Sequence, residues 1–367
     1  MGVGQSPLEG LGVKPAFGGA FSGRSVLVTG HTGFKGAWLS LWLRELGAKV
    51  VGYALPPDTT ANLHDQLDLA RLMDSRLGDV RDAALLAATL RETRPEIVFH
   101  LAAQPLVRLS YEKPAETFAT NVLGTANLLD AVRRTESVRV CVVVTTDKCY
   151  ENREDGSAYR EDDRLGGRDP YSASKACAEL VVSSYRDSFF QKEGRVSLAS
   201  ARAGNVIGGG DWACERLLPD CIRALAAGQA IAVRNPRSVR PWQHVLDPLS
   251  GYLTLAAHQL AEPAAFAEAW NFGPDPGAAL TTAEVTDLVV RAWGSGGWKD
   301  ASDPSAPHEA GLLSLDSAKA RARLGWRPDG TPQEAVARAV AWYRASREKG
   351  FDAAAFTRRQ IADYGPL

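Results

Sequence analysis

The chain has 367 residues, of which 45% are hydrophobic and 23% are charged, and its formal net charge is −1. Such a chain is long enough for a large globular core, and its charge balance indicates no general affinity for nucleic acid or for anionic membranes. Apolar runs of about 18 residues, the length of a membrane span, are not found.

The five cysteines also limit the possible classes of protein. Their number is odd, no two of them form a C-x-x-C pair, and no group of histidines and cysteines has the spacing of metal ligands. This pattern favours a reducing compartment over a disulfide framework, and it predicts no metal site. We therefore expect a cytoplasmic protein.

The first half of the chain alternates strands with helices. A strand at 25–29, a helix at about 37–46 and a strand at 49–54 form a βαβ unit. The alternation continues with strands near 78–80, 97–101, 141–144 and 196–201 and with helices near 83–90, 117–133 and 171–189. Strands that alternate with helices of this length are typical of a Rossmann-like, doubly wound parallel α/β sheet.

Domain boundaries are predicted where this alternation of strands and helices ends. Residues 1–21, rich in Gly and Pro, are predicted to be a flexible arm, and 22–205 a dinucleotide-binding domain. Residues 206–362 are predicted to form mainly a smaller α/β domain for substrate, with the chain re-entering the first domain around 229–260. Helices are expected near 216–227, 281–292, 317–324 and 332–348.

Three glycines mark the turn between the first strand and the first helix. Gly30, Gly33 and Gly36 differ in spacing from the usual dinucleotide fingerprint, but glycine allows the same close approach of backbone to a pyrophosphate at a helix N-terminus. A plain glycine-rich turn is the alternative. The second strand ends without the acidic residue that often binds the ribose of NAD, so the residues alone leave NAD and NADP open. Lys35 lies within the turn and would approach a phosphate, and Asp79 is either an adenine contact or a helix N-cap.

Polar side chains follow the apolar strand at 141–144 immediately. Thr146, Asp147 and Lys148 stand where ligands bind in open α/β sheets, outside the carboxyl ends of the strands. Tyr171 and Lys175 lie one helical turn apart, so a lysine ammonium is expected to lower the pKa of a phenol on the same helix face. A Y-x-x-x-K pair on its own is more often two surface residues.

In combination these motifs are more specific. The glycine turn, the His100-Leu-Ala-Ala103 segment, the strand-end Thr-Asp pair and the Tyr171/Lys175 pair resemble the extended short-chain dehydrogenase/reductase family over residues 22 to 350. Within that family, the strand-end acid followed by a proton-transfer residue resembles the nucleotide-sugar 4,6-dehydratases. Lys148 replaces the glutamate that most of them carry. At Lys148 and in the segments 147–152 and 240–245, the chain is similar to the branch of these dehydratases that acts on CDP-glucose.

The resemblance implies an NAD-dependent lyase that oxidises C4 of CDP-glucose, removes water across C5 and C6 and returns hydride to C6. Its product would lead to deoxy and dideoxy sugars such as those of O-antigen. The implied catalytic residues are Thr146, Asp147, Lys148, Tyr171 and Lys175. The implied cofactor contacts are Gly30, Thr32, Gly33, Phe34, Lys35, Gly36, Asp79, Val80, Leu101, Ala102, Ala103, Gln104, Thr120, Thr145, Tyr171 and Lys175. The implied substrate contacts are Asn205, Arg216, Arg240 and Asn271, and a homodimer or homotetramer is implied as well.

Lys148 would then remove the C5 proton as a neutral amine, and Asp147 would protonate the departing O6 hydroxyl. Neighbouring residues on a regular strand point to opposite faces, so both reach one sugar only if the backbone has already left the strand. A simple ion pair between them is the alternative. Arg234 and Arg237 are expected to be solvated, and Trp242 and His244 to pack between the domains.

Two other functions stay open. One is an epimerase or reductase of another nucleotide sugar, which usually lacks a strand-end acid followed by a base. The other is a regulator that senses the cofactor without catalysis and would have no need to keep both Tyr171 and Lys175.

Overall fold

The computed structural model describes residues 16–275, 277–305 and 310–364. Its centre is a seven-stranded sheet with the order β11-β6-β5-β4-β1-β2-β3. All of its strand pairs are parallel. The strands are β1 (Ser25–Thr29), β2 (Lys49–Ala54), β3 (Asp74–Leu77), β4 (Ile97–His100), β5 (Val140–Val144), β6 (Ser197–Ala203) and β11 (Ala269–Phe272). From β3 to β6 this is the Rossmann order 3-2-1-4-5-6, which confirms the predicted fold class.

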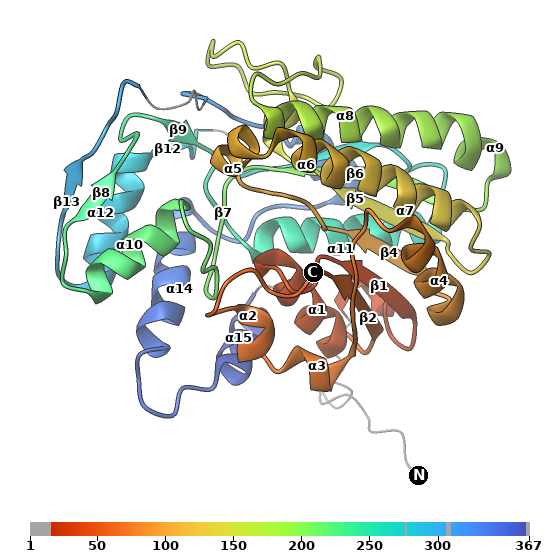
Figure 1. Cartoon of the computed structure of the whole chain (residues 1–367), viewed down its shortest axis with the longest axis horizontal. Coiled ribbons are helices and arrows are strands. Elements are labelled where there is room, and N and C mark those ends of the chain that lie inside the picture. The colour runs from red at the N-terminus through yellow and green to blue at the C-terminus, as the bar shows by residue number, and fades with distance from the viewer. Residues whose placement is uncertain (1–15, 276, 306–309, 365–367) are drawn as a thin grey trace.

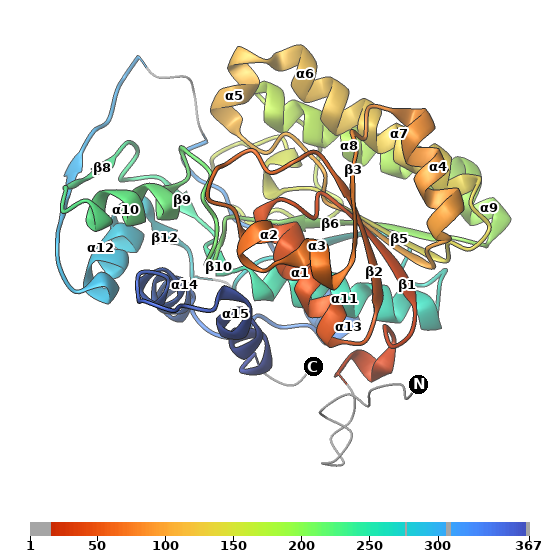
Figure 2. The same ribbon diagram turned by 60° about the horizontal axis from the view of Figure 1, so that its bottom comes forward.

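Helices cover both faces of the sheet (Figures 1 and 2). One layer contains α4 (Ala83–Thr93), α5 (Val107–Glu112), α6 (Pro114–Phe118), η2 (Ala119–Leu123), α7 (Gly124–Arg133), α8 (Pro170–Tyr185), η4 (Arg186–Phe190) and α9 (Gln191–Glu193). The other contains α1 (Phe34–Glu45), α2 (Leu63–Gln66), α3 (Leu69–Leu72), α11 (Leu246–Ala261) and α13 (Ala318–Leu324).

Alternate residues of each strand face the two layers. On β5, Val140, Val142 and Val144 join one core cluster, while Cys141 and Val143 join the other. Because both faces are covered, the strand is apolar throughout, which is the pattern expected of a buried parallel sheet.

A second lobe lies beside the carboxyl edge of the sheet (Figure 1). It is built from α10 (Leu217–Ala226), α12 (Thr282–Trp293), α14 (Pro332–Ala345) and short paired strands. Those strands are β8 (Ile231–Val233) with β13 (Trp298–Asp300), β9 (Val239–Arg240) with β12 (Leu280–Thr281), and β7 (Val206–Ile207) with β10 (Gln243–His244). α15 (Ala353–Ala362) follows and packs on α1.

Two boundary expectations need correction. The predicted arm extended to residue 21, but a 3₁₀ turn, η1 (Ala16–Gly19), already belongs to the fold, and Phe17 and Phe21 are buried in the main core. The rest of that arm lies outside the described residues. The chain re-enters the first domain with α11, within the predicted 229–260, but the return extends to residue 272, because β11 pairs with β6 and adds the seventh strand.

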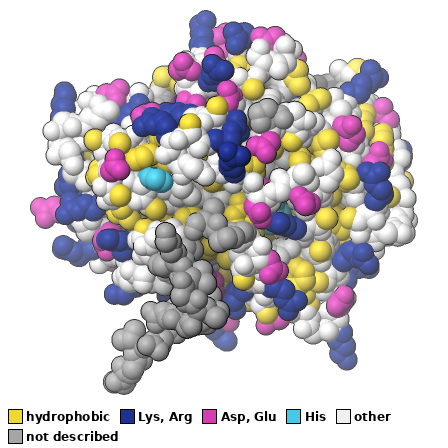
Figure 3. Space-filling view, turned by 180° about the vertical axis from the view of Figure 1, so that it is seen from behind, with side chains coloured by type: hydrophobic (Ala, Val, Ile, Leu, Met, Phe, Trp, Pro, Cys, Tyr) yellow, Lys and Arg dark blue, Asp and Glu magenta, His cyan; other side chains and the backbone are white. Residues whose placement is uncertain are grey.

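Within the described part of the chain, every helix is too short or too polar to cross a membrane. The face opposite that of Figure 1 shows acidic and basic side chains mixed with apolar ones (Figure 3), in keeping with the near-zero net charge.

Candidate active site

A cavity of about 570 Å³ opens at the carboxyl ends of the central strands, between the two lobes. It lies at the β1/β4 switch point, where the strand order reverses and where doubly wound sheets bind their ligands. The glycine turn, the end of β5 and the start of α8 line it from one lobe, and segments around α10 and β9 line it from the other.

The glycine turn has the geometry of a dinucleotide cradle. A Cβ on Gly30, whose φ is +75°, would lie 2.7 Å from the Ala102 nitrogen, and a Cβ on Gly36 would lie 2.1 Å from the Gly30 oxygen. Gly33 is the N-cap of α1, and a Cβ there would meet only the Gly30 oxygen, at 3.4 Å. Its open side borders the cavity, so the first amides of α1 are accessible to a pyrophosphate. The turn therefore fits a dinucleotide.

Most of the other predicted cofactor residues also line the cavity. These are Thr32, Phe34, Lys35, Asp79, Val80, Leu101, Ala102, Ala103, Thr120, Thr145, Tyr171 and Lys175. Asp79 forms an ion pair with Arg81, with its Oδ2 2.5 Å from Arg81 Nη2. The N-cap of α4 is Asp82, so the alternative interpretation of Asp79 as a helix N-cap is wrong.

Gln104 is the exception, because its side chain is used inside the protein. Its amide nitrogen donates to the Leu106 carbonyl and the Thr117 hydroxyl, and its amide oxygen accepts from the Leu106 nitrogen at 2.6 Å. It lies outside the cavity lining and shapes the backbone that follows β4.

Lys35 points across the cavity floor toward α11. Its Nζ donates to the Tyr252 hydroxyl at 2.8 Å and lies 5.1 Å from the centre of that ring. Burial, with added repulsion from Lys175 and Arg216, lowers the pKa of Lys35 to about 7. In this arrangement its amine is bonded to a phenol rather than held by an acid.

Thr146, Asp147 and Lys148 lie on a turn that has left the strand. β5 ends at Val144, and residues 147–149 form a 3₁₀ turn, η3 (Asp147–Cys149), capped by the Thr146 hydroxyl. All three side chains line the cavity, because the 3₁₀ geometry removes the alternation of a strand.

The two carboxylate oxygens of Asp147 have different environments. Oδ1 accepts from the Thr146 hydroxyl at 2.9 Å and lies 3.7 Å from Lys148 Nζ. Oδ2 is buried and has no hydrogen-bond partner among the described residues, and a Cβ added to Gly204 would lie 3.1 Å from it. The Lys148 side chain is 20% exposed, against 1% for Asp147.

Tyr171 and Lys175 line the same cavity from α8. Burial raises the pKa of Tyr171 to about 12, partly offset by a hydrogen bond with Thr146. Burial lowers the pKa of Lys175 to about 8, and its Nζ donates to the Val144 carbonyl at 3.2 Å. The expected lowering of the phenol pKa by Lys175 is thus absent in this geometry, because desolvation dominates.

Three of the four predicted substrate contacts face the cavity. These three are Asn205, Arg216 and Arg240. Arg216 forms an ion pair with Asp211 at 2.9 Å, and Arg240 Nη1 donates to the Val239 carbonyl. Asn205 Oδ1 is buried and has no hydrogen-bond partner among the described residues. Asn271 does not reach the cavity. It lies on β11, where it accepts from the Tyr150 hydroxyl and donates to the Tyr159 carbonyl.

The structure also brings residues to the cavity that the sequence did not single out. Arg108 and Arg234 face each other across Glu215, at 3.6 and 3.4 Å. Arg234 was expected to be solvated; its side chain is instead 31% exposed and lines the cavity, while Arg237 stays outside it. Trp242 lines the cavity too, whereas His244 is buried against Trp38, as expected of a packing residue. This charged triplet comes from α5, the turn before α10 and the residue after β8, which are distant in sequence, so no local motif indicated it.

Within residues 16–275, 277–305 and 310–364, His, Cys, Asp and Glu side chains form no group that would hold a metal ion. The five cysteines are free.

The fold, the glycine cradle and the Tyr/Lys pair define a dinucleotide-dependent enzyme of the short-chain dehydrogenase/reductase type. More specifically, the chain belongs to the GDP-mannose 4,6 dehydratase family, whose sequence model matches residues 27–339. It is 50% identical over 348 residues to the CDP-glucose 4,6-dehydratase of Salmonella typhimurium, which covers 94% of this chain and 97% of the relative. It is 34% identical over 273 residues to a dTDP-glucose 4,6-dehydratase of Streptomyces antibioticus, covering 74% of this chain and 76% of that protein.

Solved structures agree with the fold. A dTDP-glucose 4,6-dehydratase from Streptomyces venezuelae with NAD and TYD bound superimposes with a TM-score of 0.73 at 28% identity, covering 88% of this chain and 98% of that one. The UDP-glucose 4-epimerase of Thermotoga maritima, with UDP-glucose, reaches a TM-score of 0.77 at 21% identity over 88% and 100% of the two chains. At that identity the similarity concerns the fold alone.

Proposed function

We propose that the chain is a CDP-glucose 4,6-dehydratase, which converts CDP-D-glucose into CDP-4-dehydro-6-deoxy-D-glucose and water. The observation that carries the proposal is one cavity containing two sets of groups. Tyr171 and Lys175 suit oxidation at C4, and Asp147 and Lys148 on η3 suit elimination across C5 and C6. The 50% identity to the Salmonella enzyme over nearly the whole chain supports both the reaction and the choice of CDP-glucose.

NAD, when bound, would take hydride from C4 of the sugar and return it to C6, so it is not consumed. We assign its binding to the glycine turn and to the cavity-lining residues at the ends of β1, β4 and β5. The cradle geometry and the NAD-bound dehydratase of the same fold support this assignment.

Oxidation at C4 requires removal of the O4 proton. Tyr171 is the base in this proposal, and Thr146, whose hydroxyl is near the phenol, positions O4. A phenol with a pKa of about 12 needs a neighbouring cation before it acts at neutral pH. Lys175 and the positive nicotinamide ring are the cations that the site would supply.

Elimination uses η3. Once C4 is a ketone, the C5 proton is acidic, and Lys148 as the amine removes it while Asp147 as the acid protonates the departing O6 hydroxyl. Oδ1 of Asp147 is already occupied by Thr146 and Lys148, so Oδ2 is the oxygen assigned to this proton.

The diphosphate of the substrate is assigned to Arg216 and Arg240, with Asn205 beside them. Arginine suits a diphosphate because its guanidinium donates in a bidentate fork. Arg108 and Arg234 enlarge this basic wall, and Glu215 pairs with them at the cavity mouth.

A homo-oligomer is part of the proposal. Tyr111, Phe118, Leu123 and Leu180 are large apolar side chains exposed on α5, α6, η2 and α8, which are neighbouring helices of one layer. Apolar residues exposed over adjacent helices mark an interaction surface.

The free cysteines suit a reducing compartment, and we propose that the enzyme acts in the cytoplasm. We also propose that its product leads to deoxy and dideoxy sugars such as those of O-antigen.

The direct test is incubation of the purified protein with CDP-glucose and NAD, without added reductant. We expect a 4-keto-6-deoxy sugar, which is detected by its absorbance in alkali. Formation of an epimerised CDP-hexose would support the epimerase alternative, and absence of any product with CDP-, dTDP- and GDP-sugars would reject an enzymatic role.

A further inference from the structure

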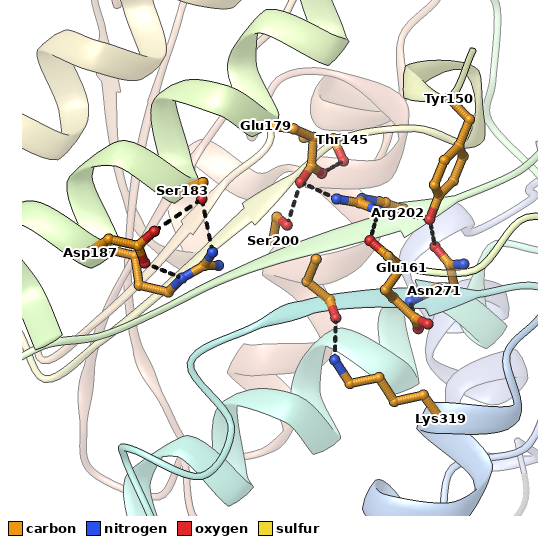
Figure 4. A network of polar contacts seen from close by, with 12 residues as sticks. Thr145, Tyr150, Glu161, Glu179, Ser183, Asp187, Ser200, Arg202, Asn271 and Lys319 are labelled. Atoms are coloured by element: carbon orange, nitrogen blue, oxygen red, sulfur yellow. Dashed lines mark hydrogen bonds and ion pairs between the residues drawn. The ribbon is translucent and has the colours of Figure 1, made fainter. Parts of the chain in front are cut away.

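A buried ion pair, Glu179–Arg202, is hydrogen-bonded to Thr145 and Tyr150, which flank the turn that carries Asp147 and Lys148 (Figure 4). Glu179 is on α8, one turn beyond Lys175, and Arg202 is on β6. Arg202 Nη2 and Glu179 Oε2 are 2.7 Å apart, and the two side chains are only 4% and 3% exposed.

The pair is fully hydrogen-bonded on its acidic side. Glu179 accepts from the Thr145 hydroxyl at 2.5 Å, from the Ser200 hydroxyl at 2.7 Å and from Arg202. Burial alone would raise the pKa of Glu179, but the charge of Arg202 and these bonds outweigh it, and the pKa is lowered. A buried ion pair contributes little to net stability compared with an apolar replacement. We therefore ask which groups this pair holds in place.

Both ends of the catalytic turn are attached to this pair. Thr145, just before the turn, donates to Glu179, and Tyr150, just after it, accepts from Arg202 Nη1 at 2.7 Å. The Tyr150 hydroxyl also donates to Asn271 on β11, so the turn is held against α8, β6 and β11 at once (Figure 4). This explains where Asn271 acts, given that it does not reach the cavity.

We propose that Glu179 and Arg202 are positioning residues that set η3 for the elimination step. Through Thr145 and Tyr150 they hold Asp147 and Lys148 in register with Tyr171 and Lys175, which share α8 with Glu179. This inference rests on the proposed dehydratase function. Misplacement of η3 by a fraction of an ångström impairs removal of the C5 proton and loss of the O6 hydroxyl more than removal of the C4 hydride.

The experiment compares two Tyr→Phe variants from one small core. Tyr150→Phe removes the hydroxyl that binds Arg202 and Asn271, while its ring stays stacked on Tyr159, 5.1 Å away. Tyr159→Phe is the matched control, because this residue is similarly buried, while its hydroxyl donates to Asn152 and accepts from the Arg153 nitrogen and makes no hydrogen bond to the ion pair among the described residues.

With CDP-glucose and NAD, we expect kcat of Tyr150→Phe to fall about tenfold and the steady-state fraction of reduced cofactor to rise, because oxidation outpaces elimination. The kinetic isotope effect of C5-deuterated CDP-glucose should rise in parallel. Tyr159→Phe should leave all three quantities at the wild-type values. A merely structural role would lower the amount of active enzyme in both variants without changing the fraction of reduced cofactor.

A second variant, Glu179→Gln, keeps the side-chain shape and removes the charge. It should give the same accumulation of reduced cofactor in whatever portion of the protein is folded, when assayed well below pH 8, where Lys175 keeps its charge without the attraction of Glu179. Wild-type reduced-cofactor fractions in both Tyr150→Phe and Glu179→Gln would overturn the inference. If the wild-type protein itself dehydrates no nucleotide sugar, the proposed function fails instead, and the two outcomes are therefore distinct.

Discussion

At the scale of single residues, the account depends on Asp147 and Lys148 sharing one cavity although they are adjacent in sequence. A strand would send them to opposite faces, and the 3₁₀ turn that begins right after Thr146 is what brings both inward. Lys148 Nζ lies 3.7 Å from Asp147 Oδ1, so the proposed base and the proposed acid of the elimination are within ion-pair distance of each other.

Replacing Lys148 by Met should remove the base and leave the fold and the cofactor site in place. We expect dehydration of CDP-glucose to fall by about 100-fold or more, in the range of a lost general base. The assay is the alkali absorbance of the product. Lys192→Met, an exposed lysine on α9, is the control. Normal turnover by Lys148→Met would refute the assigned role.

The ammonium of Lys175 should set an upper pH limit on activity. Burial lowers its pKa to about 8, against the opposing attraction of Glu179 and, to a smaller extent, Cys149. Because the charged form is the one required, kcat/KM for CDP-glucose should fall as pH rises through about 8. A profile that stays flat to well above this pH would contradict a requirement for the ammonium.

Local sequence motifs predicted those site residues that lie close together in the sequence. The glycine turn, η3 and the Tyr171/Lys175 pair all line one cavity. Asn271 and Gln104 were assigned from family patterns, and only the packing of β11 and of the loop after β4 shows that they bind other protein groups. Arg108 and Arg234 were missed because residues 126 positions apart meet only in the folded chain.

At the scale of secondary structure elements, most strands of the first half were predictable because each is a short apolar run followed by a turn. β3 is the exception: its sequence, DSRL, is mostly polar, and it ends at Leu77, before the predicted 78–80. The alternation of strands and helices predicted a doubly wound parallel sheet but not the order of its strands. α11 and β11 were not predicted. α11 is buried along most of its length, so it lacks the amphipathic period that reveals a surface helix, and β11 is only four residues long.

Substitutions in the glycine turn before α1 can separate effects on protein stability from effects on cofactor binding. In Gly33→Ala the new Cβ borders the cavity and meets no close protein atom, so the melting temperature should be nearly unchanged while NAD affinity falls about tenfold, or about 1.4 kcal/mol. In Gly36→Ala the Cβ would strike the Gly30 carbonyl, and unfolding should be easier by about 3 kcal/mol or more.

Thermal melting and calorimetric titration with NAD measure the two effects. Gly297→Ala, at a glycine without a positive φ whose added Cβ would meet nothing within 4 Å, is the control for the loss of a glycine alone. Equal NAD affinity in Gly33→Ala and the wild type would mean that the cofactor does not approach this turn.

At the scale of the whole molecule, the chain has little net charge and its two lobes enclose a cavity, and the apolar side chains exposed on the α5–α8 layer are the main surface left to explain. Introducing a charge there tests the proposed association. Leu180, 58% exposed on α8, can be replaced by Glu without disturbing the core.

We expect Leu180→Glu to shift the protein toward the monomer in analytical ultracentrifugation, because a carboxylate at an interface core must be desolvated without a partner. Leu77→Glu, a similarly exposed leucine on β3 in a different region, should leave the oligomeric state unchanged. An identical sedimentation coefficient for Leu180→Glu and the wild type would place any oligomer interface elsewhere.

In the proposed reaction, one cavity both oxidises C4 and reduces C6 of the same sugar. CDP-glucose carrying deuterium at C4 distinguishes this internal transfer from exchange with solvent, with the product analysed by NMR. We expect a 4-keto-6-deoxy sugar with deuterium at C6, transferred within the site. Product with hydrogen alone at C6 and the label lost to solvent, or product with deuterium retained at C4, would contradict it.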